Sequence, residues 1–266
     1  MIKLLAVDMD GTCLDSRSRM TDATLDALRS AANHGILVVP TTGRALTCLP
    51  HRLAAARNLY RYVISSNGAR VTDLDTKKSV YAADIPRKTA LSLLAELPRG
   101  LGVTSHLDHQ YLIQGRLLLQ MGRMIYGRDA REARRVRDMS AFLRDQDHSV
   151  EELQLFFFSP GARGRVEQAL ARYPQLSAAY SGMYVEIYAK TASKGTALAA
   201  LARSLGLDRS EIACVGDGEN DLSMFAAAGL RFAMGNAVEA LKAQADLVLP
   251  TNDQDGVAAA VNHILS

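Results

Sequence analysis

Residues 4–12 read LLAVDMDGT, a short apolar run that ends in two aspartates and a glycine. The short length, a β-branched residue and the glycine that follows favour a buried strand that enters a loop. Asp8 and Asp10 lie two residues apart, so both side chains would share one face of an extended chain, and the loop can turn them toward one crevice. We therefore expect a first strand that delivers two carboxylates at its carboxyl end.

The alternation of strand and helix continues outward from this segment. A helical spacing after Thr21 is followed by apolar runs at residues 36–40 and 62–65. Near the C-terminus, helical segments at 193–205 and 221–228 alternate with apolar runs at 212–215, 232–234 and 247–249. Continuous apolar strands separated by helices indicate a parallel sheet covered on both faces. We expect an α/β fold with a doubly wound, parallel-sheet, Rossmann-like core.

The middle of the chain has a different pattern. Strand patterns at 103–105, 111–114, 153–158 and 185–188 are mixed with helical patterns at 87–97 and 163–172, and some are joined by hairpin-like turns. This mixture predicts an α+β domain inserted into the first domain. We expect a core domain of residues 1–82 and 188–266, and an inserted domain of residues 83–187.

Composition limits the classes of function. The chain has 266 residues, of which 48% are hydrophobic, and its 31 basic and 28 acidic residues are spread over the whole length. It can bury a sizeable core, and it lacks the basic concentration of a dedicated nucleic-acid binder. The three cysteines are far apart, and no apolar run approaches the ~20 residues of a membrane helix. We expect a soluble, cytoplasmic protein without a nucleic-acid or membrane partner, in an oligomeric state that the sequence leaves open.

A second acidic group follows another apolar strand. Residues 215–221 read VGDGEND, so Asp217 would reach the same sheet edge as Asp8, and Asp221 would lie in the first helical turn. An isolated Asp-x-Asp pair more often marks a polar turn, and one acid there can be only a helix cap. Several carboxylates around two strand ends are costly unless a divalent cation is present. The two groups together predict a Mg²⁺ site, or an acid–base residue that stays protonated.

Two further motifs would suit a bound anion. The segment Thr41-Thr42-Gly43-Arg44 offers a hydroxyl and backbone N–H groups after a strand, although Thr42 could equally be an ordinary helix cap. Lys194 starts the helix after the inserted domain, where the helix dipole disfavours a cation unless an anion lies nearby. The ordinary alternative is a solvated surface lysine. An anion-binding role for Lys194 is favoured only because the other motifs are also present.

In order and spacing, these motifs resemble the four motifs of the haloacid dehalogenase superfamily of phosphohydrolases, in its Cof-type branch. They are DMDGT at 8–12, TGR at 42–44, Lys194, and GDGENDLSM at 216–224. The resemblance extends to SNGA at 66–69 and MGNA at 234–237 and covers nearly the whole chain. The inserted domain lies where that branch carries its α/β cap.

The resemblance implies a role for each motif residue. Asp8 would be the nucleophile that forms an aspartyl phosphate, and Asp10 the general acid and base. Mg²⁺ would be held by the Asp8 side chain, the Asp10 backbone carbonyl and Asp217, with Asp221 behind these ligands and Thr12 orienting Asp10. The phosphoryl oxygens would be surrounded by Thr42, Lys194, Asn220 and the N–H groups of Met9 and Gly43.

The function implied is a Mg²⁺-dependent phosphatase of small organic phosphate monoesters, such as a sugar phosphate, a nucleotide or a cofactor phosphate. Its partner would be a small phosphorylated metabolite. One alternative is a phosphotransferase or phosphomutase of the same superfamily, which returns the phosphoryl group to a sugar. The other is a non-catalytic module that accepts phosphate on Asp8, but such modules lack the large insertion and do not need Asp10. The six histidines form no ligand-spaced set, so no zinc is implied.

Residues 116–137 contain seven arginines against two acidic residues. A basic face is usually only solvated, and Arg128, Arg131 and Arg135 have a helical spacing with Glu132 available as a partner. The functional alternative is that one or two of these arginines bind a second anionic group of the substrate.

Overall fold

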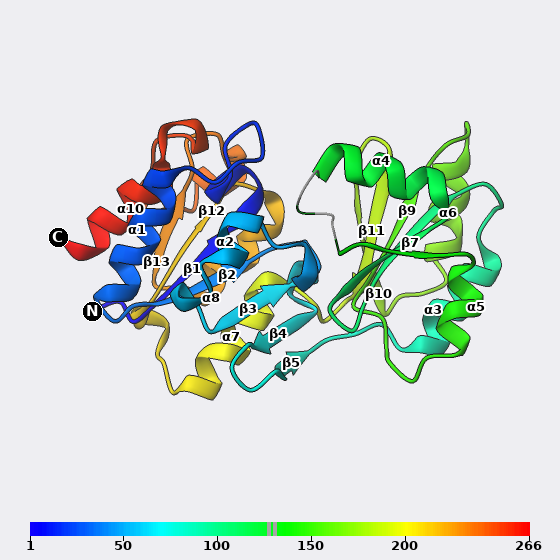
Figure 1. The fold of residues 1–266 in the computed structure, drawn as a ribbon, viewed down its shortest axis with the longest axis horizontal. Coiled ribbons are helices and arrows are strands. Elements are labelled where there is room, and N and C mark those ends of the chain that lie inside the picture. Colours follow the sequence, from blue (N-terminus) through cyan, green and yellow to red (C-terminus); the bar gives the residue numbers. More distant parts are fainter. Residues whose placement is uncertain (127–128, 130–131) are drawn as a thin grey trace. The chain divides into compact units, whose positions relative to one another are not determined.

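The computed structural model describes residues 1–126, 129 and 132–266, and the chain divides into two compact units (Figure 1). The core unit comprises Met1–Arg44, Leu49–Ala82 and Ser193–Ser266. The inserted unit comprises Ala45–Cys48 and Ala83–Ala192. Within the described residues, no helix combines the length and the apolar character that crossing a membrane requires.

The core unit is built on an eight-stranded sheet in the order β14-β13-β12-β1-β2-β3-β4-β5. Its strands are β1 (Leu4–Asp8), β2 (Leu37–Thr41), β3 (Tyr62–Ser65), β4 (Arg70–Asp73), β5 (Lys78–Ala82), β12 (Ile212–Gly216), β13 (Leu230–Ala233) and β14 (Leu247–Val248). The strands from β14 to β3 pair in parallel, which confirms the predicted α/β class. The antiparallel extension by β4 and β5 was not predicted.

Helices cover both faces of this sheet. They are α1 (Asp22–Asn33), α2 (His51–Ala55), α7 (Lys194–Leu205), α8 (Leu222–Ala227), α9 (Glu239–Lys242) and α10 (Gly256–Leu265). Helices α1 and α10 pack together on one face, and α7 and α8 pack together on the other (Figure 1). All five residues of β1 are therefore buried, as a strand covered on both faces requires.

Capping residues set the helix boundaries that position the site. The Thr21 hydroxyl accepts the Thr24 N–H at the start of α1. Ser193 and Thr196 form a reciprocal capping box at the start of α7, and Gly206 ends α7 in a left-handed conformation (φ 66°). These caps satisfy backbone groups that a helix end leaves unpaired, and they fix Lys194 as the first residue of its helix.

The inserted unit contains a six-stranded sheet in the order β10-β11-β9-β6-β7-β8. Its strands are β6 (Gly102–Leu107), β7 (Gln110–Gln114), β8 (Arg134–Val136), β9 (Glu152–Phe156), β10 (Leu176–Tyr180) and β11 (Tyr184–Ala189), and its helices are α3 (Arg87–Glu96), α4 (Arg116–Tyr126), α5 (Met139–Arg144) and α6 (Ala162–Leu170). Every strand pair is antiparallel except β7–β8, which confirms the predicted α+β character. The expected segments are present, whereas α4, α5, β8 and β10 were not predicted.

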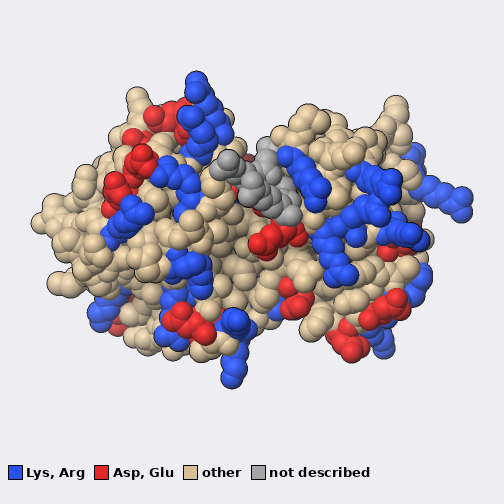
Figure 2. Space-filling view, viewed as in Figure 1, with Lys and Arg blue, Asp and Glu red and all other residues tan. Residues whose placement is uncertain are grey.

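Where the arginine-rich segment is described, it contains α4 and β8. Arg128 and Arg131 lie outside the described residues, and Arg135 lies in strand β8, so its helical spacing was wrong. The five described arginines of 116–137 are all exposed, and Figure 2 shows basic side chains gathered on the visible face of the inserted unit. The Arg134 guanidinium lies 5.4 Å from the centroid of the Phe142 ring. These positions are those of a solvated face.

Candidate active site

Parallel pairing of β1 with β12 brings the two acidic motifs together. The register pairs Val7 with Val215, so both strands end at the same edge of the sheet. Carboxylate oxygens of Asp8, Asp217 and Asp221 lie within 4.8 Å of one another. Residues about 200 positions apart in the sequence thus form one acidic cluster, as the spacing of the motifs predicts.

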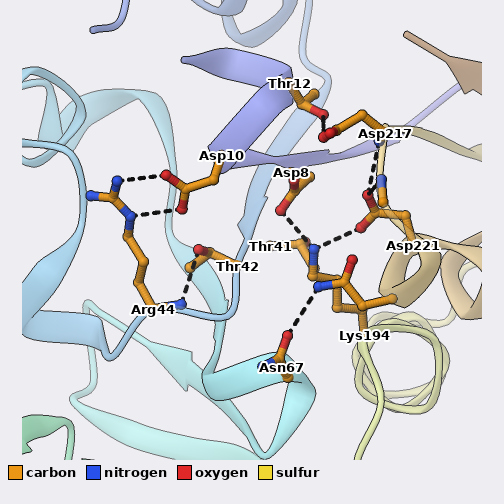
Figure 3. A network of polar contacts seen from close by, with 12 residues as sticks. Asp8, Asp10, Thr12, Thr41, Thr42, Arg44, Asn67, Lys194, Asp217 and Asp221 are labelled. Atoms are coloured by element: carbon orange, nitrogen blue, oxygen red, sulfur yellow. Dashed lines mark hydrogen bonds and ion pairs between the residues drawn. The ribbon is translucent and has the colours of Figure 1, made fainter. Parts of the chain in front are cut away.

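Lys194 lies at the centre of this cluster (Figure 3). Its side chain is 1% exposed, and its Nζ donates to Asp8 Oδ1 and to Asp221 Oδ1, each at 2.6 Å. Burial lowers the pKa of Lys194, but the charges of Asp221 and Asp8 outweigh this effect and raise it above the ordinary value. Lys194 is therefore a buried ammonium with two carboxylate partners, and the alternative of a surface lysine is wrong.

One ammonium does not balance three carboxylates. Burial and the charge of Asp221 raise the pKa of Asp8 well above its usual value, against the opposing charge of Lys194. Burial also raises the pKa of Asp217, although the Thr12 hydroxyl opposes the shift. The carboxylates thus carry more negative charge than this pocket stabilises, which is the electrostatic signature of a cation site.

The donor set also suits a hard cation. Both oxygens of Asp221 are engaged by the protein, Oδ1 by Lys194 and Oδ2 by the backbone N–H groups of Asp217 (2.9 Å) and Gly218 (3.0 Å). Asp8 and Asp217 therefore have more capacity left for a ligand. Gly11 leaves room for the Asp217 carboxylate, because a Cβ at Gly11 would lie 2.3 Å from Asp217 Oδ2. Oxygen ligands of this kind suit Mg²⁺.

Asp10 does not share a crevice with Asp8 (Figure 3). Its two carboxylate oxygens accept from Arg44 Nε (2.8 Å) and Nη2 (2.6 Å), and its side chain is 53% exposed. The loop Met9–Cys13, in which Gly11 has a φ of 80°, turns Asp10 away from the strand direction. The Thr12 hydroxyl, which was expected to orient Asp10, donates to Asp217 Oδ1 at 2.7 Å.

The motif after β2 forms a turn and no immediate α-helix. The Thr42 hydroxyl accepts the Arg44 N–H at 3.1 Å, and the next α-helix begins only at His51. Thr42 is buried and follows Thr41, which pairs with Asp8 across β1 and β2. Thr42 therefore lies beside the acidic cluster (Figure 3), and its hydroxyl accepts a hydrogen bond within the turn.

Asn67 joins two motifs and was missed as a site residue. Its Oδ1 accepts from Asn220 Nδ2 at 3.1 Å, and the same oxygen would lie 3.0 Å from a Cβ at Gly43. It has a left-handed backbone (φ 53°) in the turn after β3, which asparagine tolerates better than most residues. The SNG signal predicted the turn but gave no reason to place the amide between Gly43 and Asn220. Arg44, which belongs to the Thr-Gly-Arg motif and pairs with Asp10, was likewise not predicted as a site residue.

Residues 5–261 match the family of haloacid dehalogenase-like hydrolases. The chain belongs to that family. It is 29% identical to the 5-amino-6-(5-phospho-D-ribitylamino)uracil phosphatase YcsE of Bacillus subtilis, over 98% of this chain and 95% of that protein. It is 30% identical to the phosphatase YwpJ of the same organism, over 99% of this chain and 100% of that protein.

A solved structure of a haloacid dehalogenase-like hydrolase from Bacteroides thetaiotaomicron matches with a TM-score of 0.86 and 26% identity, over 99% of this chain and 100% of the other. The fold, with its inserted second sheet, is therefore that of the Cof-type hydrolases. This hydrolase is a phosphatase, in the class of the phosphoric monoester hydrolases. The acidic cluster of Asp8, Asp217 and Asp221 is consistent with a metal site of such phosphatases.

Proposed function

We propose that this hydrolase is a Mg²⁺-dependent phosphatase that releases phosphate from small organic monoesters through an aspartyl phosphate on Asp8. The observation that carries this proposal is the buried Lys194 ammonium between Asp8 and Asp221, with Asp217 beside them. A carboxylate held by a lysine at the carboxyl edge of a parallel sheet is placed to attack an incoming phosphorus atom. The same positive charge would stabilise the oxygens of the transferring phosphoryl group.

In the first step, an Asp8 carboxylate oxygen bonds to phosphorus while the bond from phosphorus to the ester oxygen breaks. Asp10 supplies the proton that the leaving alkoxide takes up. Lys194, Thr42, Asn220 and the N–H groups of Met9 and Gly43 would surround the phosphoryl oxygens. Asn67 would keep Asn220 in place through its side-chain hydrogen bond, and its backbone N–H donates to the Thr42 carbonyl, next to Gly43, at 3.1 Å.

In the second step, water attacks the phosphorus of the aspartyl phosphate. Its proton passes to Asp10, and the bond from phosphorus to Asp8 breaks, which restores the carboxylate. For both steps Asp10 must exchange the Arg44 guanidinium for the reacting oxygen, because the Arg44 pair now occupies its two oxygens. Arg44 thus fixes the resting position of the acid–base residue.

Mg²⁺ would be held by the Asp8 side chain, the Asp10 backbone carbonyl and Asp217. When bound, it supplies positive charge that neutralises the attacking carboxylate and the phosphoryl oxygens. Asp221 and Thr12 would orient these ligands, since Asp221 holds Lys194 and the backbone N–H of Asp217, and Thr12 donates to Asp217.

The substrate that we propose is a small phosphorylated metabolite in the cytoplasm. One relative is named for a phosphorylated ribitylaminouracil, which is a metabolite of this class. The boundaries that we propose for the substrate-specificity domain are residues 83–187.

A panel of sugar phosphates, nucleotides and cofactor phosphates, assayed for released phosphate with Mg²⁺ or EDTA, tests the activity. Transfer of the phosphoryl group to an added sugar would instead identify a phosphotransferase.

Removal of the metal should abolish activity and lower stability. EDTA is expected to stop phosphate release, and Mg²⁺ at about 100 times its Kd is expected to stabilise the fold by about 2.7 kcal/mol through binding to the native state. Asp217→Asn should weaken both effects because it removes one carboxylate ligand. Asp26→Asn, a change in an exposed ion pair on α1, serves as the matched control for charge. Full turnover in EDTA would contradict the metal requirement.

Asp10→Asn should separate substrates by their leaving groups. With an alkyl phosphate, kcat/KM is expected to fall about 10²–10⁴-fold, because the leaving alkoxide needs the proton. With 4-nitrophenyl phosphate, formation of the aspartyl phosphate should continue, and the phosphorylated protein should accumulate because water is no longer activated. Rapid-quench mass measurement of the intact protein detects this species. Equal losses in kcat/KM for the alkyl and the aryl ester would contradict the acid role.

A further inference from the structure

The inserted unit contains a cavity of about 420 Å³ between α4, the sheet and the β10–β11 turn. All described residues that line it belong to the inserted unit. Its volume lies within the range of pockets that hold small organic molecules. The core site described above contributes no residue to it.

The two faces of the sheet explain why a cavity remains on one of them. Leu153, Leu155 and Ile187 are fully buried and alternate along β9 and β11 with the residues that line the cavity, so they lie on the opposite face of the sheet. Figure 1 shows α3, α5 and α6 on one side of this sheet. The other face carries alternate residues of the same strands and has α4 as its only helix among the described residues. On α4, Gly122 approaches the sheet closely, because a Cβ there would lie 3.5 Å from Ile113 Cδ1.

Aromatic rings and methionine side chains form the walls of the cavity. The rings of Phe156 and Tyr184, on neighbouring strands, have centroids 5.3 Å apart and planes tilted by 31°. Met121 of α4 and Met183 of the β10–β11 turn also line the cavity. Aromatic rings and polarizable thioethers favour contact with the face of a planar ring.

One polar group in the cavity has a fixed orientation. The Gln154 Nε2 donates to Glu152 Oε1 at 2.7 Å, and Glu152 is fully buried. The Gln154 Oε1 accepts from the hydroxyls of Thr104 (3.0 Å) and Tyr111 (3.1 Å). Because a carboxylate only accepts, these contacts decide which end of the amide is the nitrogen. Among the described residues, no contact uses the second N–H of this amide, so it remains for a ligand.

A hydrogen-bond acceptor lies on the strand next to this donor, on the same face of the sheet. Glu186 of β11 is paired with Gln154 of β9 in the antiparallel register, and both line the cavity. Residues directly opposite in such a pair have Cβ atoms about 4.5–5.5 Å apart. A carboxylate has several lone pairs and can accept from a ligand in addition to its contacts within the protein. The cavity therefore presents a donor and an acceptor side by side, next to aromatic walls.

We propose that this cavity binds a planar heteroaromatic ring with a lactam edge, in which a ring carbonyl adjoins a ring N–H. The carbonyl would accept from the Gln154 amide, the ring N–H would donate to Glu186, and the ring face would lie against Phe156 and Tyr184. A purely hydrocarbon ligand would make no hydrogen bond to the Gln154 amide or to Glu186. A phosphate or carboxylate would meet the like charge of Glu186, and the described residues that line the cavity include no lysine or arginine.

This inference concerns binding by the inserted unit and does not depend on catalysis by the core unit. If the proposed function also holds, phosphate esters of such rings become the substrate class to test first. The two are separated by Asp8→Asn, which should bind the ring normally and release no phosphate.

Lumazine (pteridine-2,4-dione), which is fluorescent and carries no phosphate, is the probe. Titration of the full chain should quench its fluorescence saturably, and the chain contains no tryptophan to interfere. The 1,3-dimethyl derivative keeps the planar ring but has no ring N–H to donate. Its Kd should be at least about tenfold higher. Equal affinity for both compounds, or the absence of saturable binding of lumazine at millimolar concentration, would overturn the proposal.

Variants locate the binding. Phe156→Ala and Glu186→Gln should each raise the Kd for lumazine at least about tenfold. Met183→Ala tests the rim at an exposed position, where a folding defect is not expected, and should raise the Kd by a smaller factor. Phe142→Ala removes a half-buried aromatic ring of α5 outside the cavity and should bind as the wild type does. The same Kd in Phe156→Ala, Glu186→Gln and Phe142→Ala would also overturn the proposal.

Discussion

Asp8→Asn is expected to lower phosphate release at least about 10³-fold, which corresponds to about 4 kcal/mol of activation free energy. An amide is a poor nucleophile and a weaker ligand for Mg²⁺ than a carboxylate. The wild-type side chain lies at the end of β1, buried and 2.6 Å from Lys194 Nζ. Steady-state assays on the best substrate, with saturating Mg²⁺, measure the loss.

Stability provides the control for this variant. The pKa of Asp8 is raised, so the folded protein disfavours its charged form relative to the unfolded chain at neutral pH. Asparagine removes that charge while Asp221 still pairs with Lys194. The free energy of unfolding in EDTA should therefore be maintained or increased. Wild-type turnover in a folded Asp8→Asn protein would refute the nucleophile assignment, and collapse of the fold would assign Asp8 a structural role.

Lys194→Met is expected to damage both activity and folding. It removes the only cation seen to contact Asp8 and Asp221 among the described residues, and both carboxylates are buried. Leaving buried charges unpaired costs about 3–5 kcal/mol, and loss of a charge that stabilises the phosphoryl oxygens costs about 10²–10³-fold in kcat. Denaturant unfolding in EDTA and phosphate release with Mg²⁺ measure the two effects. Unchanged kinetics and stability in Lys194→Met would contradict the central position of this lysine.

The pH dependence distinguishes lost charge from lost packing. In Lys194→Met, the pKa of Asp8 should rise further, because the lysine that opposes the shift is gone. As the pH falls from about 8 to about 5, the folded variant should take up protons that the unfolded chain does not, so its deficit in stability should shrink. Leu198→Ala, at a fully buried position on the same helix, should cost about 2–5 kcal/mol with no such pH dependence. An identical pH response of the two variants would indicate a packing defect alone.

Local sequence signals were sufficient for much of the fold. The apolar run before Asp8 predicts a buried strand, and Thr21 predicts the start of α1, because both depend on neighbours along the chain. The β4–β5 extension was missed, since β5 is largely exposed and both strands turn back along the edge of a sheet that is otherwise parallel. The direction of Asp10 was missed because it depends on Arg44, 34 residues further along the chain.

By itself, the sequence determined the class of the fold, the acidic residues of the site and the family to which the chain belongs. These follow from residue types, periodicity and the order of motifs. Only the tertiary structure decided that Lys194 is buried between two carboxylates, that Asp10 pairs with Arg44, and that Gln154 and Glu186 face one cavity. The physical reason is that burial, ion pairing and pKa depend on distances between atoms that chain folding brings together, and those distances are not encoded in local spacing.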